Sequence, residues 1–174
     1  MELLASRRLR DFQQQLSRRL QQAADLHGAT QDCVAGATAA RHWLFDLAFI
    51  AEVIAVPAIT AVPFTRPWYL GLINHRGDLA GVIDLDGLTG ASVAPPRDGD
   101  RLLLLSSSLP VRCALRVAQL GGTQDRASLR ELAPDTALPA WGSASYEDAA
   151  GTRRHWLDIA ALLRDPAFID ISCC

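Results

Sequence analysis

The 174-residue sequence contains no lysine, and all 17 of its basic residues are arginines. Chemistry that depends on lysine is therefore excluded, including Schiff-base formation, the phosphate-binding lysine of P-loop proteins and the nucleotide-binding lysine of protein kinases. The formal net charge is −2, whereas nucleic-acid binders usually carry a basic face. No apolar run is long enough to cross a bilayer, and the N-terminus lacks the apolar segment of a signal peptide. We expect a soluble, cytoplasmic protein with no transmembrane segment and no nucleic-acid partner.

The common signatures of catalytic and metal sites are also missing. The four histidines share no metal-ligand spacing such as H-x-x-x-H, and the four cysteines form no C-x-x-C pair. The nucleophile-elbow, P-loop and dinucleotide-binding motifs are absent. Cys33 and Cys113 are expected as core thiols, and Cys173 and Cys174 as a frayed terminus, because adjacent cysteines do not easily close a disulfide. We expect no cofactor, no metal and no enzymatic activity.

The first 28 residues carry apolar side chains at steps of three and four, which is typical of an amphipathic helix. The helix is predicted from Leu3 to Leu26, and Gly28 follows it as a stop signal. Arginines and glutamines cover the opposite face. This face pattern leaves three uses open: packing on the same domain, docking on a partner, or lying on a membrane surface. Residues 1–28 and 29–174 are therefore expected to be separate parts of the chain.

The rest of the chain reads as short strands separated by frequent turns, which is typical of a mostly β barrel or sandwich. Four strands are predicted at Ala40–Leu47, Phe49–Val56, Arg101–Ser106 and Val111–Leu120. The Arg101–Ser106 strand is expected to be buried on both faces, and the Val111–Leu120 strand to end at Gly121 and Gly122. Two hairpins are predicted, one within residues 70–85 and one formed by Trp141–Glu147 and Arg153–Leu157.

Shorter features complete the prediction. Helical turns are expected at Leu85–Leu88, at Ala127–Leu132 and at Asp158–Leu163, which Asp158 begins and Pro166 ends. The Pro/Gly/Asp-rich loop Ala91–Asp100 is expected to separate two halves. Phe168 and Ile171 near the C-terminus are expected to pack against the rest of the chain. His42 and His155, each in an Arg-His-Trp tripeptide, are expected at the surface or in a turn.

The hairpin within residues 70–85 contains the best candidate for a functional side chain. Gly77 and Asp78 are expected to reverse the chain. Arg76 beside them presents five donors in a planar fork, which can hold a carboxylate or backbone carbonyls, or can brace its own turn. Glu52 is the second candidate, because it is a lone acid in an apolar strand. Such an acid lies either on a solvent face or in a partner-binding surface.

The residues from Pro67 to Leu85, PWYLGLINHRGDLAGVIDL, resemble the signature of CheW-like domains. The N-x-R-G core followed by I-D-L carries most of the resemblance. Residues 43–54 resemble the paired strands that precede this signature in the family, and the predicted strands at 101–106 and 111–120 match the pair that follows it. The resemblance extends from about Cys33 to Asp170. Three positions depart from the family pattern: His75, Gly81 in place of a proline, and Ala118 in place of an aspartate.

This resemblance implies two intertwined five-stranded SH3-like barrels and no catalytic activity. CheW-like proteins couple chemoreceptors to a histidine kinase through its CheW-like regulatory domain, so the implied location is the cytoplasm at membrane-associated receptor arrays. The N-terminal helix and the closing residues 166–170 are more similar to the PilI branch, which serves the chemosensory system of type IV pili and twitching motility. The positions that the resemblance assigns to partner binding are Arg76, Glu52, Ile50, Ile54, Leu79 and Asn74.

The leading hypothesis is therefore a non-catalytic adaptor between a chemoreceptor and a CheA-type kinase. Two alternatives remain at this point: a β-barrel whose arginines bind a nucleotide or another small anion, and an uncharacterised hydrolase. Binding of nucleotides would indicate the first, and activity that requires His75 or Cys113 would indicate the second.

Overall fold

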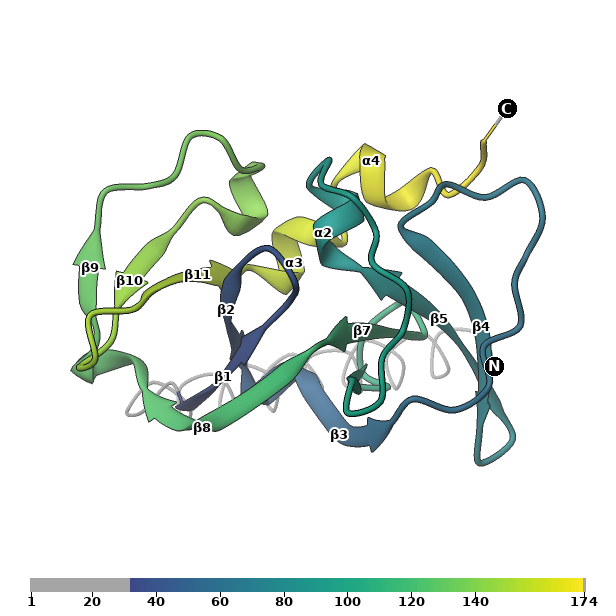
Figure 1. The fold of residues 1–174 in the computed structure, drawn as a ribbon, viewed down its shortest axis with the longest axis horizontal. Coiled ribbons are helices and arrows are strands. Elements are labelled where there is room, and N and C mark those ends of the chain that lie inside the picture. Colours follow the sequence, from purple (N-terminus) through teal and green to yellow (C-terminus); the bar gives the residue numbers. More distant parts are fainter. Residues whose placement is uncertain (1–31, 174) are drawn as a thin grey trace, which may run out of the picture. The chain divides into compact units, whose positions relative to one another are not determined.

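The computed structural model describes residues 32–173, which form a mostly β structure of two sheets (Figure 1). The predicted helix Leu3–Leu26 and the segment 1–28 lie outside the described residues. The six-stranded sheet has the order β8-β1-β2-β11-β10-β9, and the five-stranded sheet has the order β3-β6-β7-β5-β4. The mostly β class and the two-part architecture are confirmed, although one sheet has six strands where the resemblance implied five.

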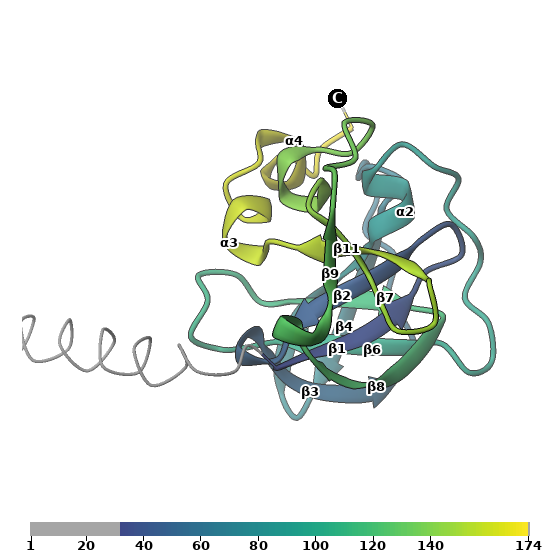
Figure 2. The ribbon, with the colours of Figure 1, turned by 90° about the vertical axis from the view of Figure 1, so that its left-hand side faces the viewer.

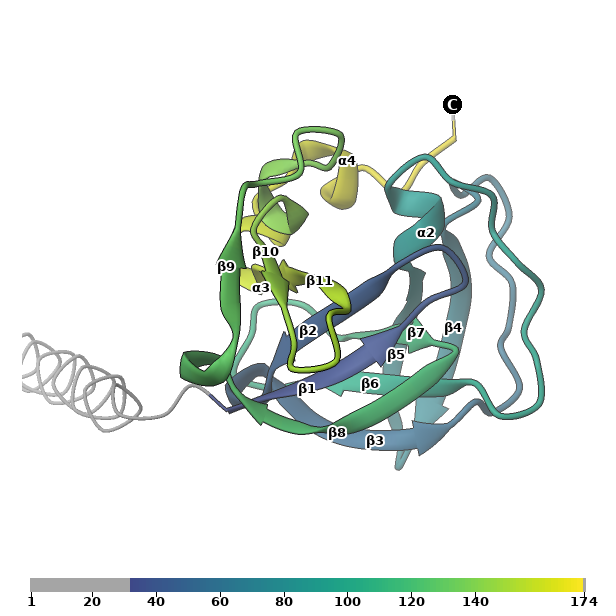
Figure 3. The ribbon, with the colours of Figure 1, turned by 60° about the vertical axis from the view of Figure 1, so that its left-hand side comes forward.

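The strands of the six-stranded sheet are β1 Asp32–Ala37, β2 His42–Asp46, β8 Gln119–Asp125, β9 Arg130–Leu132, β10 Ser145–Glu147 and β11 Arg153–Leu157. Those of the five-stranded sheet are β3 Ile50–Ala55, β4 Tyr69–His75, β5 Asp78–Asp84, β6 Arg101–Leu105 and β7 Cys113–Val117. Short helices lie between them: η1 Leu47–Phe49, α2 Leu85–Leu88, η2 Arg126–Ser128, η3 Ala140–Gly142, α3 Ile159–Leu162 and α4 Pro166–Ile169. Helices α2, α3 and α4 gather at one end of the described part, and β3 and β8 lie at the opposite end (Figures 1, 2 and 3).

The chain crosses between the sheets at two short connections. The first is η1, which links β2 to β3 and is capped by the Asp46 side chain accepting a hydrogen bond from the Ala48 amide. The second is the single residue Ala118 between β7 and β8, whose amide donates to the Ala37 carbonyl at 2.8 Å. The loop 91–100 instead joins α2 to β6 within the five-stranded sheet. The prediction that this loop separates two halves is therefore wrong. Its Pro/Gly/Asp-rich composition indicates a turn, but it does not indicate which sheet the following strand joins.

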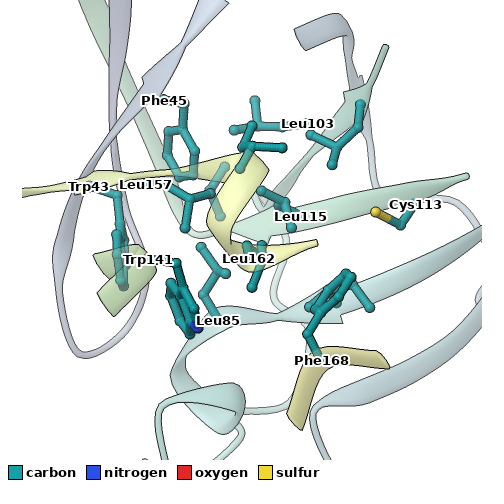
Figure 4. Close-up of a cluster of buried hydrophobic side chains, with 14 of the residues drawn as sticks. Trp43, Phe45, Leu85, Leu103, Cys113, Leu115, Trp141, Leu157, Leu162 and Phe168 are labelled. Atoms are coloured by element: carbon teal, nitrogen blue, oxygen red, sulfur yellow. The ribbon is translucent and has the colours of Figure 1, made fainter. Parts of the chain in front are cut away.

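The two sheets share one large apolar core, shown in Figure 4. Trp43 and Phe45 reach it from the six-stranded sheet, and Leu103 and Leu115 from the five-stranded sheet. The neighbouring residues of β6, at positions 102 and 104, face a second cluster. Burial of β6 on both faces is thus confirmed, and each of its buried leucines contributes about 1.5–3 kcal/mol to the stability of the fold.

Two predictions in the second half are corrected by strand pairing. Gly121 and Gly122 do not end a strand but lie inside β8, which pairs with β1 through a register shift between Val34 and Gly36. The predicted helical turn Ala127–Leu132 is confirmed in its first part, where η2 ends at Ser128, but is wrong for residues 130–132, which form the strand β9 because they pair with β10. Both errors arise because local composition was used to assign the secondary structure, whereas pairing with distant strands determines it.

The C-terminal residues follow the capping rules with one exception. Asp158 caps α3 as predicted, by accepting a hydrogen bond from the Ala161 amide. Pro166 does not end α3 but begins α4, where its missing amide hydrogen is not needed. Phe168 packs into the core as predicted. Ile171 is 37% exposed, and its carbonyl accepts a hydrogen bond from the Arg66 amide at 2.9 Å.

Candidate functional site

The hairpin formed by β4 and β5 turns on two residues, Arg76 and Gly77. Both have positive φ, +55° and +93°, and the Asn74 side chain accepts a hydrogen bond from the Gly77 amide at 3.0 Å. Two successive positive-φ residues match the right-handed twist of a hairpin. The predicted hairpin is confirmed, but its turn lies one residue earlier than expected, since Asp78 pairs with His75 in the ladder. The turn therefore holds the arginine at its tip.

Glu52 on β3 contacts two adjacent residues of this hairpin, His75 and Arg76. Its Oε1 accepts a hydrogen bond from Arg76 Nη2 at 3.0 Å, and its Oε2 lies 3.1 Å from His75 Nε2. The two candidates found in the sequence are thus joined in one ion pair across strands that are not adjacent in the sheet. The Arg76 side chain is still 74% exposed. An exposed pair of this kind contributes at most about 1 kcal/mol, so Arg76 braces its turn while most of its surface stays available.

A groove of about 200 Å³ adjoins this ion pair, and we call it the hairpin groove. Leu79, which is 59% exposed, lines it beside the charged residues of the turn. A second ion pair lines it as well, with Arg112 Nη1 placed 3.5 Å from Asp78 Oδ2. The remaining lining residues are Ala51, Ala80, Leu104, Leu105, Ser107 and Cys113. The groove therefore combines apolar walls with exposed charges of both signs.

The six predicted binding positions do not all face this groove. Glu52, Arg76 and Leu79 line it, whereas Asn74 holds the turn by its side-chain hydrogen bond. Ile50 and Ile54 are half-buried and pack against the two core clusters, outside the groove lining.

Sequence reasoning missed Arg112 and Asp78 as groove residues. They meet because β5 and β7 pair in parallel, with Gly81 opposite Cys113. No local pattern signals that pairing, since the two strands are separated by α2, a loop and β6.

The groove offers little for covalent chemistry. Burial raises the pKa of the Cys113 thiol to about 12, so this thiol stays protonated and unreactive near neutral pH. Within residues 32–173, no group of three or more histidine, cysteine or acidic side chains is placed to hold a metal ion. The arrangement suits recognition of another molecule by surface contacts.

A serine and a histidine also meet elsewhere, but both are shielded. Ser145 Oγ lies 3.3 Å from His155 Nδ1, and the two residues are only 1% and 7% exposed. The prediction that His155 lies at the surface is therefore wrong, because β11 pairs with β2 and places the ring against Trp43. Burial also lowers the pKa of His155. A hydroxyl this deeply buried cannot meet a substrate.

No helix in the described range 32–173 combines the length and the apolar character needed to span a bilayer.

Comparisons with known proteins agree with this description. A family model described as the CheW-like domain matches residues 33–167. Protein PilI of Pseudomonas aeruginosa is 31% identical over 84 residues, which cover 48% of this chain and 47% of that protein. The alignment thus spans about half the length of this curated relative.

A solved structure resembles the fold described here. The scaffolding protein TtCheW from Thermoanaerobacter tengcongensis has a TM-score of 0.63 and 20% sequence identity, over 74% of this chain and 88% of that one. At this identity the likeness shows the fold. The family model covers most of the sequence and confirms the resemblance found in residues 67–85. The chain belongs to the CheW-like domain family.

Proposed function

We propose that the chain is a non-catalytic adaptor that couples a chemoreceptor to a CheA-type histidine kinase. The signalling pathway is bacterial chemotaxis or the twitching motility of type IV pili, and the site of action is the cytoplasmic side of membrane-associated receptor arrays. Membership in the CheW-like family supports this proposal. The names of the two similar proteins, PilI and a scaffolding CheW, agree with it.

The observation that carries the proposal is the hairpin groove. It presents an apolar surface at Leu79 beside the exposed guanidinium of Arg76. Apolar contacts with a neighbouring charged fork give a surface that can both bind and orient a protein partner. In this proposal Arg76, Glu52 and Leu79 contact the partner, Asn74 keeps the turn in shape, and Ile50 and Ile54 position β3.

The test measures binding of the full chain to two purified partners from the same organism: a receptor cytoplasmic fragment and the kinase regulatory domain. Arg76→Ala is expected to weaken binding of at least one partner tenfold or more, because exposed arginines at interface centres often dominate affinity. Arg130→Ala is the matched control, since Arg130 is also an exposed arginine paired with a glutamate, Glu147 at 2.7 Å, but lies on the other sheet. Circular dichroism checks that each variant is folded.

Two results would argue against the proposal. Unchanged binding of both partners by folded Arg76→Ala would remove the groove from the interface. A thermal shift with nucleotides that Arg76→Ala abolishes would favour the small-molecule-binding alternative.

A further inference from the structure

A buried ionic cluster lies at the far end of the strands that carry the groove. It consists of Asp84 at the end of β5, Arg116 in β7 and Asp100 just before β6. Their side chains are 5%, 6% and 7% exposed. Arg116 Nη2 donates hydrogen bonds to Asp84 Oδ2 and, at 2.6 Å, to the Ala94 carbonyl. Both hydrogens of Arg116 Nη2 are thus engaged in hydrogen bonds.

The other terminal nitrogen, Arg116 Nη1, has no hydrogen-bond partner among residues 32–173. Arg116 Nη1 lies 4.0 Å from Asp100 Oδ2, beyond the reach of a direct hydrogen bond. A buried donor on a charged group is costly when it is left without an acceptor. The distance is instead typical of two groups joined through a third molecule.

A cavity of about 20 Å³ adjoins these groups beneath the loop 91–100. This volume is enough for one water molecule, which needs roughly 10–15 Å³. Its polar lining includes the three carboxylates of Asp84, Asp86 and Asp100 and the guanidiniums of Arg97 and Arg116. The excess of negative charge disfavours an anion.

The acceptors around the cavity are unequally occupied. Asp86 accepts hydrogen bonds from the Thr38 hydroxyl at 2.6 Å and the Ala40 amide at 3.0 Å. Asp84 accepts from Arg116 and, at 2.8 Å, from the Gly87 amide. Within residues 32–173, Asp100 accepts one hydrogen bond, from the Arg97 amide to Oδ2 at 3.1 Å. Asp100 is therefore the carboxylate with most capacity to accept another donor.

We propose that this cavity binds a single water molecule, which accepts a hydrogen bond from Arg116 Nη1 and donates one to Asp100. Arg116 Nη1 and Asp100 Oδ2 are 4.0 Å apart. A water oxygen about 2.8 Å from each of them would make an angle of roughly 90° with the two atoms, which a water molecule tolerates. The bridged cluster stabilises the parallel pairing of β5 with β7, in which Asp84 stands directly opposite Arg116. The same two strands carry Asp78, Ala80 and Cys113 into the hairpin groove at their other end.

The test is a crystal structure of the full chain at about 1.5 Å resolution. The expected result is one solvent peak within hydrogen-bond distance of both Arg116 Nη1 and Asp100. A direct Arg116–Asp100 contact without such a peak would overturn the proposal, and so would a peak that contacts neither residue.

A solution measurement complements the crystal structure. In a water-selective nuclear Overhauser experiment, the guanidinium protons of Arg116 are expected to show a cross-peak to a long-lived water molecule. This cross-peak is expected to be lost in Asp100→Leu and kept in Asp100→Asn, which retains an acceptor of the same shape. An identical signal in wild type and in folded Asp100→Leu would contradict the bridge.

Discussion

Gly71 provides a sharp test of how the groove hairpin is held. Its φ is +133°, a conformation that L-residues rarely adopt. A Cβ at this position would lie 2.2 Å from the Thr60 carbonyl oxygen and 2.8 Å from its carbonyl carbon. Thr60 and Leu72 exchange two backbone hydrogen bonds of 2.8 Å just beside it. Gly71→Ala must therefore push the segment around Thr60 away from β4.

The expected cost follows from these contacts. Forcing alanine into this backbone conformation costs about 1–3 kcal/mol. Moving Thr60 away loses two hydrogen bonds of about 1 kcal/mol each. The total of about 3–5 kcal/mol is a large part of the roughly 5–15 kcal/mol that stabilises an ordinary domain. For a chain of this size, the melting temperature is expected to fall by about 6–20 °C.

Two glycines serve as matched controls in urea and thermal unfolding. Gly77→Ala also forces a side chain into positive φ, but nothing lies within 4 Å of the added Cβ, so a loss of only about 1 kcal/mol is expected. Gly122→Ala has neither strain nor contact and is expected to change stability by less than about 0.5 kcal/mol. If the free energies of unfolding of Gly71→Ala and Gly77→Ala differ by less than about 1 kcal/mol, the close approach of Thr60 to Gly71 is wrong.

The remaining predictions concern buried titratable groups. Because burial lowers the pKa of His155 below its ordinary 6.5, the unfolded state binds the proton first and the free energy of unfolding should decrease as the pH falls below about 6.5. His155→Gln should weaken this pH dependence, whereas the exposed His42→Gln should preserve it. Cys113, whose pKa is raised to about 12, should resist alkylation at pH 8 in the folded protein, while the exposed Cys173 should react, as checked by peptide mass spectrometry. Asp84→Ala should lower the free energy of unfolding in urea by about 3–5 kcal/mol, because its arginine partner would remain buried without this carboxylate.

Each of these predictions has a clear contrary result. An equal pH dependence of unfolding in wild type and His155→Gln would show that this histidine is not a source of it. Alkylation of Cys113 at the rate of Cys173 would contradict its burial. A loss of less than about 1 kcal/mol in Asp84→Ala would place the ion pair in the range of exposed pairs.

The features that the sequence predicted correctly are those set by local chemistry. The β-branched run predicted β3 and the leucine-rich run predicted β6, because such runs favour strands whichever strand they later pair with. The positive-φ preference of glycine located the β4–β5 hairpin to within one residue. Asp158 marked the start of α3 because a side-chain cap acts within three residues. The family followed from one contiguous motif for the same reason.

The tertiary structure decided every relation between distant residues. It joined Glu52 to Arg76, 24 positions away, and placed Arg112 beside Asp78 through a parallel strand pair. It also carried the chain from one sheet to the other at Ala118, where composition had suggested the loop 91–100.

Residues 67–85 therefore determined by themselves that the chain has a CheW-like hairpin with an arginine at its turn. Only the fold decided what surrounds that arginine: an acid from β3, an apolar groove, and a buried ionic cluster at the far end of β5 and β7. The physical reason is the distance along the sequence over which each interaction acts. Turn and capping preferences act over a few residues, whereas strand pairing brings together side chains whose spacing in the sequence carries no signal.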